Sequence, residues 1–208
     1  KELLQEHEKQ NAGPIALTDI NSTSACLYHA MNCQSRGWRV VMGVDFRKSA
    51  DQKFIAIAKN NKGFENINLY LSNILHKTIK LKDEAPALPH TYIIYPLKNK
   101  PNRKLRANEY VGVSHTELFR FQKTINAAPN GEFQQDKYVA LNPVTFRNKR
   151  DFNAHRLLRA IDKNVLLSML DTKEQGEQSH TFYSKNDLQE LYAGYEYLLE
   201  NAQQLLKR

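Results

Sequence analysis

Two β-like runs that lie close together in the sequence constrain the fold of this chain most. The segments from Val40 to Phe46 and from Phe54 to Ala58 are rich in apolar side chains that alternate with other residues, and a polar loop separates them. Alternation at a period of two indicates strands with one buried face, and the short connection predicts a β-hairpin. Three further strands are predicted at Thr91–Tyr95, Glu109–Ser114 and Lys137–Leu141.

Other segments carry apolar residues at helical spacing instead. They run from Cys26 to Cys33, from Phe64 to His76, from Phe152 to Leu170 and from Leu188 to Leu206. Strands followed by helices favour an α+β fold. We expect a mixed or antiparallel central sheet, an early helix of the kind that carries a nucleophile, and a C-terminal helical pair. Residues 15–208 are expected to form one domain after a leader segment at 1–14. A subdivision near 147–151 would separate an α/β part from a C-terminal helical part.

The net charge indicates the class of binding partner, and the cysteine content indicates the cellular compartment in which the protein works. The 208 residues include 30 Lys and Arg against 22 Asp and Glu, a formal net charge of +8, which favours an acidic partner. The acidic partner expected here is an acidic protein surface, a ubiquitin-like protein or a nucleic acid. Cys26 and Cys33 lie too far apart on one helix for a disulfide, so a cytoplasmic protein or a bacterial protein delivered into a host cytosol is expected. No run of apolar residues is long enough for a membrane span.

The segment from Asn21 to Cys33 is the candidate site for chemistry. Ser22, Thr23 or Ser24 is expected to N-cap a helix whose first turn contains Cys26. A helix N-terminus stabilises a thiolate and can lower the pKa of a cysteine well below its free value of about 8.5. Thiol catalysis also needs a histidine base and a polar group that orients it. His90 and Glu109 are the first choices for these roles.

The residues around Cys26 also resemble two families of papain-like deubiquitinases. Cys26-Leu-Tyr-His-Ala30 is similar to the start of the nucleophile helix in ovarian-tumour-type enzymes. Leu17 to Gln34 and the strand from Tyr92 to Lys98 are similar to segments of ubiquitin-specific proteases. The resemblance implies a cysteine hydrolase that acts on protein or ubiquitin-type amide bonds.

The chain departs from these family patterns at three positions. Thr23 and Ser24 replace the Asp and Gly expected before the cysteine, and Lys137 stands where the family places its catalytic histidine. If Lys137 occupies that position, the resemblance implies an inactive relative. Otherwise His90 or His115 is the base, oriented by Glu109 or Asn142.

Two basic stretches are candidates for binding a partner. The first consists of Lys98, Lys100, Arg103, Lys104 and Arg106, and the second of Arg147, Lys149, Arg150, Arg156 and Arg159. Either could contact an acidic segment of another protein, which makes a non-catalytic adaptor or chaperone-like protein the alternative function, or could contact phosphates. A nucleic-acid-binding protein or nuclease is therefore the third hypothesis.

A metal or cofactor is not expected. Cys26, His29 and Cys33 share one helical face, but no second cysteine pair completes a tetrahedral zinc site. Gly43 to Phe46 resembles the first strand of a metal-dependent nuclease core, yet the later strands do not end in acidic residues.

Overall fold

The computed structural model describes residues 2–9, 15–127 and 133–207. The chain divides into two units. The sheet unit consists of Pro14–Leu141 and Gly194–Arg208, and the helical unit consists of Lys1–Gly13 and Asn142–Ala193. The division begins at Asn142, ahead of the expected 147–151, and the last helix returns to the sheet unit. None of the helices in the described ranges is both long and apolar enough to cross a bilayer.

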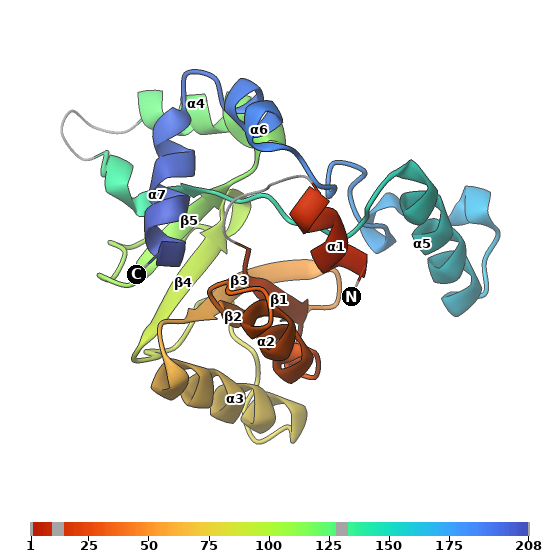
Figure 1. Cartoon of the computed structure of the whole chain (residues 1–208), viewed down its shortest axis with the longest axis horizontal. Coiled ribbons are helices and arrows are strands. Elements are labelled where there is room, and N and C mark those ends of the chain that lie inside the picture. The colour runs from red at the N-terminus through yellow and green to blue at the C-terminus, as the bar shows by residue number, and fades with distance from the viewer. Residues whose placement is uncertain (1, 10–14, 128–132, 208) are drawn as a thin grey trace. The chain divides into compact units, whose positions relative to one another are not determined.

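The sheet unit is built on six strands in the order β1-β2-β3-β4-β5-β6 (Figure 1). The strands are β1 Leu17–Ile20, β2 Met42–Lys48, β3 Asp51–Ala58, β4 Thr91–Pro96, β5 Glu109–Val113 and β6 Tyr138–Ala140. The pairs β2–β3 and β3–β4 are antiparallel, and β1–β2, β4–β5 and β5–β6 are parallel. The sheet is therefore mixed, and the α+β fold is confirmed, including the predicted hairpin.

The helices of the sheet unit cover both faces of the sheet. They are α2 Cys26–Gln34, α3 Asn61–Leu75, α4 Leu118–Asn126 and α7 Glu196–Lys207, with the 3-10 segments η1 Leu97–Asn99, η2 His115–Glu117 and η3 Gln135–Lys137. Ile67 and Leu71 of α3 pack on Val44, Phe46 and Phe54 and neighbouring core residues. Leu205 of α7 packs on the opposite face, against Ile55, Ile57 and Tyr92 among others. Alternating side chains of the strands thus fill two cores.

The helical unit contains α1 Glu2–Lys9, α5 Lys149–Asp162, η4 Leu167–Met169, η5 Thr172–Glu174 and α6 Lys185–Leu191. The expected 1–14 leader thus includes a helix, while residues 10–14 lie outside the described part. Asn148 caps α5, because its side chain accepts hydrogen bonds from the N–H groups of Arg150 and Asp151. Ser184 and Asp187 form the predicted capping box of α6.

Three local predictions were wrong. The long helix expected from Leu188 to Leu206 breaks into α6 and α7 around Gly194, which has a φ of 81° that favours glycine. The helix expected to reach Leu170 ends at Asp162. The N-cap residue of α2 is Ala25, without a side-chain hydrogen bond. The hydroxyl of Thr23 instead donates to Asn68 of α3 at 2.8 Å.

Candidate functional site

Cys26 begins α2, as the sequence predicts, but its thiol lies in an environment that disfavours a thiolate. The side chain is only 3% exposed. Burial raises the pKa of Cys26, and the negative charge of Asp19 raises it further. The backbone N–H of Cys26 already donates to the carbonyl of Thr23. The helix start therefore does not lower the pKa here.

His90 lies three strands away from β1, the strand that carries Asp19. The charge of Asp19 acts on Cys26, and Asp19 lies opposite Val44 of β2 in the sheet. Val44 in turn lies opposite Ala56 of β3, and Ala56 lies opposite Ile93 of β4. His90 precedes β4, so β2 and β3 separate it from β1, a lateral distance of about 14 Å at roughly 4.8 Å per strand. His115 follows β5, one strand further away. Neither predicted base therefore belongs to β1 or to its neighbour β2, the strands nearest to Asp19.

The backbone of His90 supports the junction between β3 and α3. His90 adopts a φ of 59°, and its carbonyl accepts from the N–H of Lys59 at 3.0 Å. The same carbonyl lies so close to Gly63 that a Cβ added at Gly63 would be 1.9 Å from it. The side chain of His90 is exposed. These contacts give the His90 main chain a structural role.

The cysteine–histidine contact on α2 involves Cys33 and His29. Cys33 Sγ lies 3.5 Å from His29 Nε2, and both residues are buried. Burial raises the pKa of Cys33 and lowers the pKa of His29, so both groups are neutral near pH 7. The spacing of four residues, one helical turn, is the sequence signal for this pair. Because solvent does not reach the sulfur, the pair has the features of a core contact.

Glu109 is the centre of a buried polar network. The residue is fully buried, and its carboxylate accepts two hydrogen bonds from Arg103, both at 2.8 Å. The Tyr95 hydroxyl donates to it at 2.9 Å, and the Arg106 N–H at 2.7 Å. Burial alone would raise the pKa of Glu109, but the donors, Arg103 above all, outweigh it and hold the pKa at about 2. Both oxygens are thus occupied by donors from Arg103, Tyr95 and Arg106 and not by a histidine of the described residues.

The first basic stretch is largely engaged within the sheet unit. Arg103 also pairs with Glu84 at 2.7 Å, and Arg106 lies 3.4 Å from Glu109. Lys98 pairs with Asp51, the Lys100 ammonium lies 5.8 Å from the centre of the Tyr138 ring, and the Lys104 side chain is exposed. The two arginines that the sequence suggests for partner binding therefore hold a buried carboxylate.

Lys137, at the position that the resemblance gives to a catalytic histidine, binds a neighbouring loop. Its ammonium donates to the carbonyls of Arg106 and Ala107, both at 3.0 Å, and lies 5.2 Å from the centre of the Tyr110 ring. These contacts connect η3 to the loop before β5.

The second basic stretch lies at the start of α5 and along it, in the helical unit, where Arg156 donates to Gln175 and Arg159 donates to Glu174. Arg147 pairs with Asp151 at 2.7 Å. Lys149 and Arg150 are exposed in the first helical turn. These two cations are available at the surface, at a helix end whose dipole adds positive potential.

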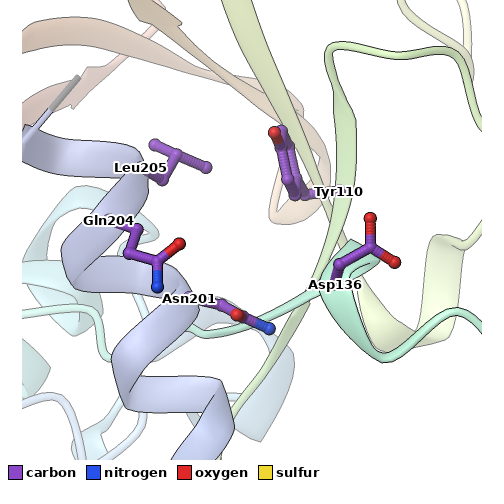
Figure 2. A pocket seen from close by; sticks show the side chains of 5 residues that line it. All are labelled: Tyr110, Asp136, Asn201, Gln204 and Leu205. Carbon is purple, nitrogen blue, oxygen red and sulfur yellow. The ribbon is translucent and has the colours of Figure 1, made fainter.

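A small hollow lies between α7, β5 and η3 (Figure 2). It has a volume of about 120 Å³ and is lined by Tyr110, Asp136, Asn201, Gln204 and Leu205. The amide nitrogen of Asn201 donates to the carbonyls of Gln135 and Tyr138 and so attaches α7 to η3 and β6. None of the lining residues is a cysteine or histidine, so the hollow is not a thiol site.

Within the described residues, no three His, Cys, Asp or Glu side chains form a group that could hold a metal ion. Comparisons of the chain with protein-family models and with the curated proteins gave no match.

Proposed function

We propose that this chain is a non-catalytic module that binds an acidic segment of a partner protein through the start of α5. The observation that carries the proposal is the exposure of Lys149 and Arg150 in the first turn of α5. The net charge of +8 attracts acidic partners over a longer range. Arg103 and Arg106, by contrast, are occupied by Glu109.

Charge reversal tests this proposal. A fluorescent Glu- and Leu-containing helical peptide is titrated with the full chain, and binding is followed by anisotropy. The double variant Lys149→Glu/Arg150→Glu is expected to weaken binding about tenfold, which corresponds to about 1.4 kcal/mol. Lys80→Glu/Lys82→Glu is the matched control, because it removes two exposed lysines of the sheet unit and changes the net charge by the same amount. Equal losses in both variants would contradict a specific role for α5.

A cysteine hydrolase with Cys26 as nucleophile stays a prediction. The burial of Cys26 and its raised pKa support a non-catalytic role instead. Iodoacetamide labelling near pH 7 separates the two hypotheses, since a non-catalytic Cys26 reacts as slowly as Cys33 in the folded protein. Faster labelling of Cys26 than of Cys33 would favour the hydrolase.

A further inference from the structure

Helix α5 has its polar and apolar faces reversed. Phe152, His155, Arg156, Arg159 and Ala160 follow each other at helical spacing and are wholly or partly buried. Leu157, Leu158 and Ile161 lie on the opposite face and are exposed. An amphipathic helix ordinarily buries its leucines and exposes its arginines.

The contacts within the helical unit explain the buried face. Arg156 donates to Gln175 at 2.7 Å, and Arg159 donates to the side chain of Glu174. His155 Nε2 accepts from the N–H of Gly176 at 3.3 Å. The polar side chains of this face thus have partners on the segment after α5, which fixes the orientation of the helix.

The exposed apolar surface is extensive. Leu158 is 65% exposed and Ile161 is 66% exposed. Four more exposed apolar residues follow the end of α5 in the sequence, Val165, Leu166, Leu167 and Met169. A concentration of exposed apolar side chains in one short segment is typical of an interaction site, whereas single scattered ones are not.

We propose that the outer face of α5, defined by Arg150, Leu157, Leu158 and Ile161, together with the exposed Lys149 beside it in the first turn, binds an acidic amphipathic helix of a partner protein. This inference rests on the function proposed above and specifies its partner. The apolar side of the partner helix packs on Leu157, Leu158 and Ile161. Carboxylates at one end of it meet Lys149 and Arg150, where the dipole of α5 also favours negative charge.

The distribution of charge favours a protein over an anionic bilayer. Helices that lie on membranes carry cations along both flanks of the apolar stripe. Here Arg156 and Arg159 bind Gln175 and Glu174 instead. Asp162, with a side chain that is 60% exposed, follows Ile161 directly. Positive charge is concentrated at one end of the stripe, which suits a partner helix with an acidic end.

The experiment compares the full chain with three variants, Leu158→Glu, Leu69→Glu and Lys149→Glu/Arg150→Glu. The probe is a fluorescent synthetic helix with Leu at helical spacing and Glu clustered at one end, and a peptide of the same composition in scrambled order is the control. Leu158→Glu is expected to reduce affinity for the ordered peptide at least tenfold. Leu69→Glu is the matched control, because Leu69 on α3 is 62% exposed, and it is expected to change affinity less than twofold. Circular dichroism checks that all three variants fold.

Each outcome has a distinct meaning. Loss of binding with Leu158→Glu and with Lys149→Glu/Arg150→Glu supports the inference. Loss with the charge variant alone leaves the acidic-partner function in place and overturns the apolar docking face. Indifference to all three variants overturns both. Binding to phosphatidylserine vesicles but not to the peptide, or self-association that Leu158→Glu abolishes, would overturn the partner helix in favour of a bilayer or a second copy.

Discussion

The sheet unit and the helical unit use the same residue types in opposite ways. In the sheet unit, Arg103 binds the buried Glu109, and Ile67 of α3 lies in the core. In the helical unit, Arg156 and Arg159 belong to the packed face of α5, and Leu158 is exposed to solvent. The first arrangement stabilises a fold, whereas the second leaves apolar surface without a partner. A count of basic residues in the sequence does not distinguish these two roles.

The largest effect is expected from the buried carboxylate of the sheet unit. Glu109→Gln removes the buried carboxylate to which Arg103 donates and leaves Arg103 only the more exposed Glu84, and breaking a buried ion pair costs about 3–5 kcal/mol. Asp51→Asn makes the same chemical change at a side chain that is 46% exposed, and is expected to cost less than about 1 kcal/mol. Urea unfolding followed by the fluorescence of Trp38, the single tryptophan, reports on the sheet unit. Similar losses in both variants would show that Glu109 is not specially stabilising.

A pair of apolar substitutions compares the inward and outward helix faces directly. Ile67→Ala removes a fully buried side chain of α3 and is expected to cost about 2–5 kcal/mol. Leu158→Ala on α5 is expected to change stability by no more than about 0.5 kcal/mol. Thermal unfolding by circular dichroism measures both. A loss of more than about 2 kcal/mol for Leu158→Ala would mean that the outer face of α5 is covered in the free protein.

The pH dependence of stability, compared between the native chain and Glu109→Gln, tests how much the ionised Glu109 carboxylate stabilises the fold. The pKa of Glu109 is about 2 in the folded protein, against an ordinary 4.5. Because the folded pKa is the lower one, Glu109 contributes stability above about pH 5 that is lost as the pH falls towards 2, roughly 3 kcal/mol in all. The stability difference between the native chain and Glu109→Gln should therefore shrink between pH 6 and about pH 3. A constant difference across this range would contradict the lowered pKa.

Periodicity in the sequence predicts those elements that bury one face. The hairpin of β2 and β3, the helix α3 and the strand β4 were all predicted because their apolar residues recur at clear spacing. β1 was missed because its four residues include Thr18 and Asp19, and its parallel pairing with β2 depends on residues distant in the sequence. The break at Gly194 was missed because the apolar stripe continues across it.

The candidate site was less predictable than the fold. The sequence places Cys26 at a helix start, but burial and the charge of Asp19 depend on how α2 packs against the sheet. Likewise, Arg103 and Glu109 are six positions apart in the sequence, and nothing in that spacing indicates that the carboxylate is buried. Local spacing predicts which groups are near in the chain, whereas the pKa of a group depends on its three-dimensional surroundings.

The smallest expected effect concerns the caps of the two helices that present opposite faces. Asn148 caps α5 by accepting from the N–H groups of Arg150 and Asp151, and Asn60 caps α3 by accepting from the N–H of Gly63. Replacing either with Ala is expected to cost about 1 kcal/mol. In α3 the packed core distributes this loss over the whole sheet unit, so that global unfolding shifts. The packed face of α5 presents Arg156 and Arg159, bound to the following segment, at positions where α3 presents core residues, so Asn148→Ala is expected to open the first turn locally and speed amide exchange there about fivefold. Hydrogen exchange across α5 measures this change. Uniform acceleration throughout the helical unit would instead show that α5 opens only together with the rest of its unit, and that its outward leucines belong to a cooperative structure.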